Sequence, residues 1–545
     1  MITSNKNKFV HSRRNFLGTT AVSTMGLYLS SVASFGFAQD VRMATIGNTV
    51  STQNGKVRGL LRDGVQQFWG IPYGASTANE NRFMPPQSVK PWSDVRDQFH
   101  IGNRSYQAPG VGEPAPVVLA MNRLETEGED CLNLNVFTPG TDNRTRPVMV
   151  WMHGGGFSSG SGNYLMYDGT NLAKQEDVVV VVVTHRLNIF GLIHLADMGD
   201  ERWAQSTNVG VQDLVASLQW VKDNIAEFGG DPGNVTIFGQ SGGAGKTTTL
   251  MATPSASGLF HRCIAQSGSA ITGVSATDAS AATEQYLSKL GIGKNQLDKL
   301  QTLTPKQIQD AFYSEPVIPR FGNGPVIDGS IIPRNQWSPT APSFSANVPL
   351  MAGSTQTENG WVGPPAFELA DAEMLDLFTS RIAGGNQAKG TELLNLYKNK
   401  YPNTRNRMLW LTAESDNTRR WDSQLLNRLK TEQAAAPSYL YLFNWHSPVH
   451  DNRMGSYHTL DIPFVFNNVD VAASMTGAAN TRYELAHVMS AAWAAFARTG
   501  NPNHEGMANW PAFNATDYPT MVFGDEIVAK NDPNKAERLA LAALR

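Results

Sequence analysis

The 545-residue sequence predicts an α/β fold with a mostly parallel central sheet, helices on both faces and long insertions. Two observations predict this fold class. Short β-branched runs alternate with helical patterns along the chain, which is typical of a parallel sheet covered by helices. Residues 178–183 are all valine, and so apolar a run fits a central strand that is covered on both faces.

The best-defined helix is expected over residues 211–228, where apolar residues recur at helical spacing and form one stripe. The Gly-Gly-Asp-Pro sequence at 229–232 ends that helix. No linker rich in Pro, Gly or Ser divides the chain, so residues 39–545 are expected to form a single domain. Further short strands are expected at 148–151, 235–238, 348–352, 439–443 and 521–523.

A Gly-x-Ser-x-Gly motif occupies residues 239–243, between an expected strand and a proline-free run that can be helical. An abrupt strand-to-helix turn strains the residue at its apex, and the flanking glycines leave room for the turn. The Ser241 hydroxyl would therefore stand out from the sheet as a nucleophile. The N–H group of Gly242, at the helix N-terminus, would face a developing negative charge.

A glycine triplet at 154–156 follows His153 and the expected strand at 148–151. Acyl transfer needs two or three N–H donors where the tetrahedral oxygen forms, and successive glycines can present them. A flexible turn is the simpler interpretation of the triplet alone. The Gly-x-Ser-x-Gly motif downstream favours an oxyanion hole, because the two motifs complement each other mechanically.

The run Gly245-Lys246-Thr247 resembles the end of a phosphate-binding loop. That motif requires a glycine where Gln240 stands, so a nucleotide site is not expected. No paired His or Cys spacing of a zinc site occurs either. The sequence therefore predicts an activity that needs no metal and no cofactor.

A serine nucleophile needs a base, and the base needs an acid that fixes its tautomer. In this fold class the chain order is Ser, then Asp or Glu, then His. Glu358 is a candidate acid, because it follows the strand expected to end near Gly353 and lies in a polar stretch. Position alone does not separate His446, His450 and His458 as the base.

Together with these motifs, further segments resemble the type-B carboxylesterases, the group that includes para-nitrobenzyl esterases, cholinesterases and fungal lipases. The resemblance extends over almost the whole chain that follows the N-terminal segment. It implies an α/β-hydrolase fold and a serine carboxylic ester hydrolase that works through an acyl-enzyme. The matching segments are 68–73, 82–86, 129–135, 153–157, 167–169, 228–232, 266–268, 325–329 and 499–503.

The resemblance also implies roles for individual residues. The acid is Glu358, five residues after a strand-ending glycine, and the base is His458, which precedes a Pro-Phe-Val-Phe run. Ser241 is the nucleophile. The implied oxyanion donors are Gly155, Gly156 and Gly242. Ser267 is the implied buried serine behind the triad.

The chain departs from the family pattern in three places. Gln240 stands where the family usually has Glu, which removes a negative charge beside the imidazolium and predicts weaker electrostatic support. Cys131 lacks the early partner of the family's disulfide, so Cys131 and Cys263 are both expected to be unpaired. No Trp lies between Trp92 and Trp151, so the ammonium-binding aromatic of cholinesterases is missing.

The N-terminal segment is expected to be a twin-arginine signal peptide over residues 1–38. Arg13 and Arg14 precede a mildly apolar stretch, and Ala38 follows small residues at cleavage spacing. An ordinary secretory signal or a membrane anchor is the alternative. The twin-arginine route carries folded proteins, so the enzyme would be periplasmic or secreted. No later run of 18 apolar residues occurs, so stable membrane insertion after cleavage is not expected.

Charge is close to balance, with 44 Lys and Arg against 47 Asp and Glu. Nucleic-acid binding is therefore not expected, and the expected partner is a small-molecule ester. The sequence carries no signal for an oligomeric state. Two alternatives to ester hydrolysis remain: an acyltransferase or amidase that uses the same site, and a non-catalytic binding protein on the same fold.

Overall fold

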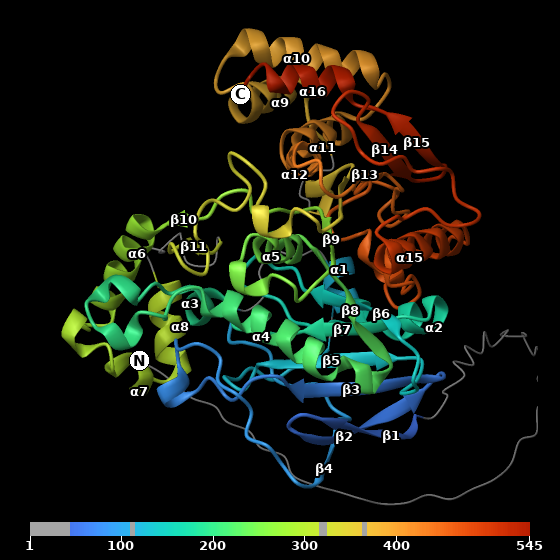
Figure 1. Cartoon of the computed structure of the whole chain (residues 1–545). Helices are drawn as coiled ribbons and strands as arrows, with labels where there is room; N and C mark the ends of the chain where they lie inside the picture. Colours follow the sequence, from blue (N-terminus) through green and yellow to red (C-terminus); the bar gives the residue numbers. More distant parts are fainter. Residues whose placement is uncertain (1–43, 109–114, 122, 315–323, 362–367) are drawn as a thin grey trace, which may run out of the picture. The chain divides into compact units, whose positions relative to one another are not determined.

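The computed structural model describes residues 44–108, 115–121, 123–314, 324–361 and 368–545 (Figure 1). Residues Met43–Arg545 form one compact unit. The expected signal peptide at 1–38 and the expected domain start at residue 39 lie outside the described residues. In the described ranges, no helix is both long and apolar enough to cross a membrane.

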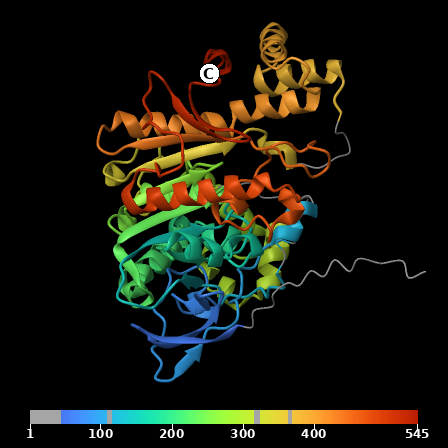
Figure 2. The same ribbon diagram turned by 90° about the vertical axis from the view of Figure 1, so that its right-hand side faces the viewer.

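One large mixed sheet runs through this unit (Figures 1 and 2). In the described part of the chain its strand order is β1-β2-β3-β5-β7-β6-β8-β9-β12-β13-β14-β15, with β4 paired to β2. The strands from β7 to β14 in that order are parallel, whereas the other neighbours in that order are antiparallel. Strand β4 pairs with β2 in parallel. The expected parallel centre is confirmed, with antiparallel additions on either side.

The strands on the first half of the sheet are β1 (Thr45–Thr52), β2 (Gly55–Arg62), β3 (Val65–Pro72), β4 (Val95–Asp97), β5 (Asn133–Thr138), β7 (Val179–Val183) and β6 (Arg146–Met152). Those on the second half are β8 (Gly230–Gln240), β9 (Arg262–Gln266), β12 (Leu350–Thr355), β13 (Ser438–Phe443), β14 (Pro519–Phe523) and β15 (Ile527–Asn531). A separate two-stranded sheet joins β10 (Val274–Ser275) to β11 (Val326–Ile327).

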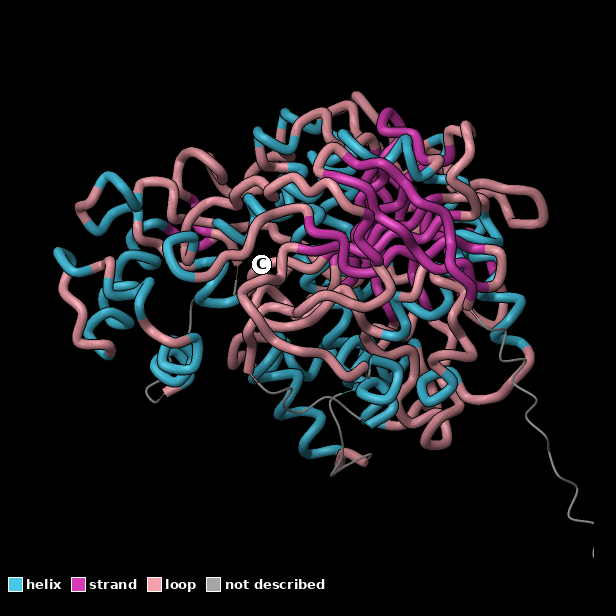
Figure 3. The backbone as a smooth tube through the Cα atoms, turned by 90° about the horizontal axis from the view of Figure 1, so that it is seen from below, coloured by secondary structure: helices cyan, strands magenta, loops and turns pink. Residues whose placement is uncertain are grey.

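Helices cover both faces of the sheet (Figure 3). On one face lie α4 (Val209–Asn224), α5 (Gly242–Met251) and α12 (Arg419–Glu432); on the other lie α2 (Thr170–Glu176) and α15 (Thr481–Thr499). Strand β7 shows why residues 178–183 are all valine. Val180 and Val182 pack into the core on the α15 side, while Val181 packs on the α4 side, since successive side chains point to opposite faces.

Insertions form two further packed regions, each with its own apolar cluster. The first contains α3 (Asn188–Leu192), α6 (Ala276–Lys289), α7 (Lys299–Thr302) and α8 (Pro305–Tyr313). The second contains α9 (Asp371–Leu377), α10 (Gln387–Lys400), α11 (Asn406–Asn417) and α16 (Lys535–Ala542). Three short helices complete the α-helices of the described residues: α1 (Ala115–Met121), α13 (Ile462–Val465) and α14 (Ala473–Thr476).

The expected elements agree with the structure, with shifts at their ends. The helix expected over 211–228 is α4 followed by a 3₁₀ turn at Ile225–Phe228, and it stops at Gly229, whose φ is 76°. Strand β8 starts at Gly230, five residues earlier than expected, because it pairs with β6 from Arg146 onward. Strand β12 continues past Gly353 to Thr355 because β13 pairs with it to that residue.

Candidate active site

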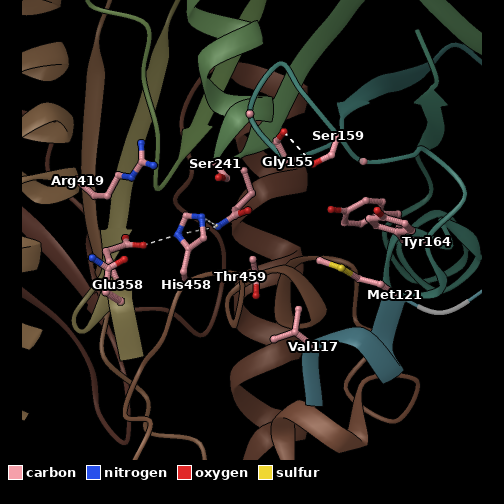
Figure 4. A pocket seen from close by; sticks show the side chains of 16 residues that line it. Val117, Met121, Gly155, Ser159, Tyr164, Ser241, Glu358, Arg419, His458 and Thr459 are labelled. Atoms are coloured by element: carbon pink, nitrogen blue, oxygen red, sulfur yellow. Dashed lines mark hydrogen bonds and ion pairs between the residues drawn. The ribbon is translucent and has the colours of Figure 1, made fainter. Parts of the chain in front are cut away.

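Ser241 forms the turn between β8 and α5, at the carboxyl edge of the parallel strands (Figure 4). Its φ of 59° and ψ of −124° are rare for a residue with a side chain, so the turn holds it under strain. The surrounding backbone allows no side chain at Gly243, because a Cβ there would lie 2.0 Å from the Met152 carbonyl oxygen. The backbone N–H of Ser241 donates to the Gln266 carbonyl at 2.8 Å, and this hydrogen bond fixes the turn.

The glycine loop after β6 lies against this turn. Gly155 and Gly156 have positive φ values of 86° and 61°, which glycine adopts readily. A Cβ on Gly242 would lie 2.3 Å from the Gly156 nitrogen, so the two backbones are in direct contact. The N–H groups of these three glycines donate to no other described residue. They can therefore donate to a substrate oxygen beside Ser241.

Glu358 and His458 form a buried hydrogen-bonded pair. Nδ1 of His458 lies 2.5 Å from Oε2 of Glu358, and the His458 backbone N–H donates to the Glu358 carbonyl at 2.9 Å. The other carboxylate oxygen accepts from the Thr355 N–H at 2.8 Å. Ser415 of α11 accepts from the Glu358 N–H at 2.7 Å. Strand β12 thus fixes the carboxylate, helix α11 fixes the Glu358 backbone, and the carboxylate orients the imidazole.

Glu358 remains ionised despite its burial. Burial raises the pKa of its carboxyl, but the charge and hydrogen bond of His458 oppose this, and the net pKa lies below the ordinary value. Arg419 and the hydroxyl of buried Ser267 act in the same direction. Asp461, three residues after His458, differs: burial raises its pKa to about 6.

Ser241 and His458 line the same cavity, but the Ser241 hydroxyl donates to no described residue. Instead, Nε2 of Gln240 lies 3.3 Å from each ring nitrogen of His458. Hydrogen bonds between a nucleophile and its base are often long without substrate. Gln240 therefore faces the imidazole directly, at the position where the resembling family carries a carboxylate.

Other histidines that follow Ser241 in the chain lie elsewhere. His446 contributes to a separate surface hollow, and His450 is exposed on a turn with φ of 55°. His261 accepts from the Val235 N–H, and His487 is exposed on α15 beside Gln175. Only His458 among them lines the cavity that holds Ser241.

The cavity has a volume of about 340 Å³. Figure 4 shows Val117, Met121 and Tyr164 on the side away from Glu358 and Arg419. Its apolar wall thus comes from α1 and from the segment after the glycine loop. A compartment of this size, apolar on one side and polar on the other, suits a small organic molecule.

Lys246 is a buried lysine beside the site, a position that the sequence did not predict. It lies on α5, is fully buried, and donates through Nζ to the His153 carbonyl oxygen at 2.8 Å, at the start of the glycine loop. Burial lowers the pKa of this amine from 10.5 to about 7. Burial and the nearby Lys246 also lower the pKa values of His153 and His185 far below the ordinary value. Lys246, which belongs to the run that resembles a phosphate-binding loop, therefore points inward and supports the glycine loop.

Three residues of the site gave no local sequence signal: Arg419, Tyr164 and Ser415. Lys246 gave a misleading one, because its local pattern resembles a phosphate-binding loop. The positions of these four residues depend on pairings between distant segments. Cys131 and Cys263 are both buried and unpaired, as expected. No group of three or more His, Cys, Asp or Glu side chains within the described ranges could hold a metal ion.

Comparisons with known proteins agree with this geometry. A family model described as the carboxylesterase family matches residues 47–541. The para-nitrobenzyl esterase of Bacillus subtilis (strain 168) is 34% identical over 500 residues, covering 90% of this chain and 98% of that protein. The phenmedipham hydrolase of Pseudarthrobacter oxydans is 31% identical over 504 residues, covering 87% of this chain and 94% of that protein.

Solved structures are similar over the same range. A carboxylesterase from Geobacillus stearothermophilus superposes with a TM-score of 0.77 at 34% identity, covering 90% of this chain and 99% of that one. An esterase from Clostridium hathewayi, described as able to hydrolyse aliphatic aromatic polyesters, has a TM-score of 0.79 at 31% identity. It covers 92% of this chain and 100% of its own.

Proposed function

We propose, since this chain belongs to the carboxylesterase family and is a carboxylic ester hydrolase with the α/β-hydrolase fold, that Ser241, His458 and Glu358 are its catalytic triad. The observation that carries the proposal is the Glu358–His458 pair, which shares one cavity with the strained Ser241. A carboxylate on Nδ1 leaves Nε2 as the proton acceptor.

In this mechanism the Ser241 oxygen attacks the ester carbonyl carbon and its proton passes to Nε2 of His458. The N–H groups of Gly155, Gly156 and Gly242 bind the oxyanion. When the tetrahedral species collapses, the alcohol leaves with the proton from His458 and the acyl group stays on Ser241. Water then attacks the acyl carbonyl and gives its proton to His458. The second tetrahedral species collapses, His458 returns the proton to the Ser241 oxygen, and the acid is released.

An acceptor-partition experiment tests this path. Two esters that share one acyl group but carry different alcohols are hydrolysed in the presence of methanol. A common acyl-enzyme yields the same ratio of methyl ester to free acid from both substrates. Ratios that depend on the departing alcohol would contradict an acyl-enzyme. A high ratio at low methanol would favour acyl transfer as the main reaction.

The substrate is proposed to be a small ester rather than a long lipid. The cavity of about 340 Å³ has an apolar wall that includes Met121 and Tyr164. Similar proteins are named for para-nitrobenzyl esters and for phenmedipham, which are small aromatic compounds. A panel of esters that varies acyl length and alcohol bulk measures this preference directly.

We also propose export by the twin-arginine route, with cleavage after Ala38. The support is the Arg13–Arg14 pair, the mild apolarity that follows, and two buried unpaired cysteines that suit folding in a reducing compartment. Replacing both arginines by lysine should retain active enzyme in the cytoplasm, whereas Lys8→Gln should not. Unchanged export of the double variant would indicate another route.

A further inference from the structure

Arg419 places a guanidinium in the active-site cavity, and this group has no bonding partner among the described residues. It is the first residue of α12, is half-buried, and lines the cavity with Ser241 and His458 (Figure 4). Its guanidinium makes no hydrogen bond or ion pair with any described residue. Arginine presents five donors in a planar fork, and partly buried arginines usually bind a carboxylate with it. The next residue, Arg420, does so with Asp416.

The carboxylates near Arg419 are already engaged. Glu358 binds His458 through Oε2 and the Thr355 N–H through Oε1. Asp422, one turn further along α12, accepts from the Ser269 hydroxyl at 3.0 Å and does not line the cavity. Arg419 acts on both only through its field. Its donors therefore face the cavity without an acceptor.

The rest of the cavity supplies no competing negative charge. Glu358 and Arg419 are the only Asp, Glu, Lys or Arg side chains among its described lining residues. Gln240, where the resembling family has Glu, is neutral and faces His458. The cavity thus has a neutral Gln240 where the resembling family has a carboxylate, and an Arg419 guanidinium that pairs with no described carboxylate. An anionic group on the substrate would pair with that guanidinium.

On this geometry, and resting on the triad proposed above, we propose that Arg419 selects esters that carry a second, free carboxylate, such as monoesters of dicarboxylic acids. The two oxygens of a carboxylate match the guanidinium fork. Ser241 would attack the ester carbonyl while the distant carboxylate binds Arg419. One water is consumed, the alcohol leaves, and the dicarboxylic acid is released.

The test uses two substrates that differ at one end, which is a charged carboxylate in one and a neutral methyl ester in the other. Benzyl hydrogen glutarate carries the free carboxylate, and benzyl methyl glutarate carries a methyl ester in its place; release of benzyl alcohol is measured for both. Arg419→Gln should lower kcat/KM for the charged ester by about 10- to 100-fold, mainly through KM, because one charge-assisted hydrogen-bond pair is lost. The neutral ester should change by no more than about threefold.

Two further variants sharpen the result. Arg419→Lys keeps a point charge without the planar fork and should fall between wild type and Arg419→Gln for the charged ester. Arg428→Gln removes an exposed arginine of the same helix that pairs with Glu432, and both esters should react as with wild type. In the wild-type enzyme, the preference for the charged ester should shrink at high salt, which needs no variant.

An equal loss on both esters would overturn the proposal and assign Arg419 to positioning Glu358. Unchanged kinetics on both esters would overturn it as well, as would a salt-independent wild-type ratio. Failure of the triad proposal looks different: Ser241→Ala would then still hydrolyse the neutral ester, whatever the charge preference.

Discussion

Two clusters among the described residues contain a serine, a histidine and a carboxylate, and only the first has the arrangement that the proposed mechanism requires. In the first, Glu358 orients His458 beside Ser241. In the second, Nε2 of His194 lies 2.9 Å from Oδ2 of Asp197, and Ser280 donates to the same oxygen at 2.9 Å. Both clusters border a cavity, of about 340 and 290 Å³ respectively.

The order of contacts separates the clusters. In the second, the carboxylate lies between the serine and the histidine, so the imidazole cannot take the proton of Ser280. The remaining ring nitrogen of His194 contacts the Thr207 hydroxyl at 2.7 Å, so both nitrogens are occupied. Ser280 lies inside helix α6, whereas Ser241 stands on a strained turn with three open N–H groups nearby. Residue types and cavity volume therefore do not define this site; backbone geometry does.

The largest expected effect is on the nucleophile. Ser241→Ala should reduce kcat by about 10⁴- to 10⁶-fold, because removal of one triad member disables the whole unit. Ser280→Ala should leave kcat within about twofold, since a serine that donates to Asp197 has no role in turnover. Steady-state hydrolysis of a neutral ester, with circular dichroism to confirm folding, measures both. Comparable losses in the two variants would break the comparison.

The histidines give the second contrast. His458→Ala should reduce kcat by a factor similar to that for Ser241→Ala, because the serine proton then has no acceptor. His194→Ala should lower the free energy of unfolding and leave kcat unchanged, because it removes the contact of the buried Thr207 hydroxyl. Near-full activity in His458→Ala, with loss in His446→Ala or His450→Ala, would show that the base is assigned to the wrong residue.

The carboxylates give a smaller contrast. Glu358→Gln should reduce kcat by about 10³- to 10⁴-fold, because an amide cannot hold the imidazole tautomer or stabilise its charged form. Asp197→Asn retains an acceptor for Ser280 and should leave kcat unchanged. The ratio of the two kcat values is the measurement. A ratio near one would mean that Glu358 only fills space.

Lys246, beside the Ser241 cluster, should make the free energy of unfolding depend on pH. Its pKa falls from 10.5 to about 7 on folding, so the unfolded chain holds the proton where the folded protein releases it. Stability from this group therefore rises between pH 7 and 10.5, and the penalty of the buried charge is complete below pH 7. The advantage of Lys246→Met over wild type should be larger at pH 6 than at pH 9, by roughly 2–3 kcal/mol.

Denaturant unfolding of both proteins at the two pH values measures this difference. Lys222→Met, which replaces an exposed lysine near the end of α4, is the matched control and should show no pH-dependent difference. A difference that is the same at pH 6 and pH 9 would mean that Lys246 stays protonated in the folded protein throughout this range.

Gln240 gives the smallest expected effect. Its amide lies 3.3 Å from both nitrogens of the His458 ring, so Gln240→Glu would place a negative charge against the imidazole. A nearby negative charge favours the protonated ring, so a higher pH is needed to free the base. The acid limb of the kcat/KM profile should move to higher pH. No shift, or a shift to lower pH, would mean that residue 240 does not face His458 during turnover.

The sequence predicts the centre of the fold better than its edges. Strand β7 consists only of valines, and β12, β13 and β14 are short apolar runs, so their composition identifies them. Strands β1 to β3 are less evident, because β3 carries Gln66 and Gln67 and the first two alternate irregularly between exposed and buried residues. Their place in the sheet depends on antiparallel pairing along the chain, which composition does not reveal.

The site divides in the same way. Ser241 and the glycine loop could be inferred from local motifs, because strained turns require particular residue types. His458 could not be separated from His446 and His450 by position; the family resemblance singled it out. Arg419 carried no local signal, and the local pattern around Lys246 pointed to a phosphate-binding loop instead. The positions of both side chains depend on segments that are far apart in the sequence.

Covalent labelling tests the central claim most directly. The enzyme is treated with a fluorophosphonate or organophosphate, which reacts with activated serines, and the modified peptide is identified by mass spectrometry. The strained turn, the adjacent base and the open N–H groups predict one label per chain on Ser241, loss of activity in proportion to labelling, and no label on Ser280. A stoichiometric label on any serine other than Ser241, with activity lost in parallel, would contradict the account.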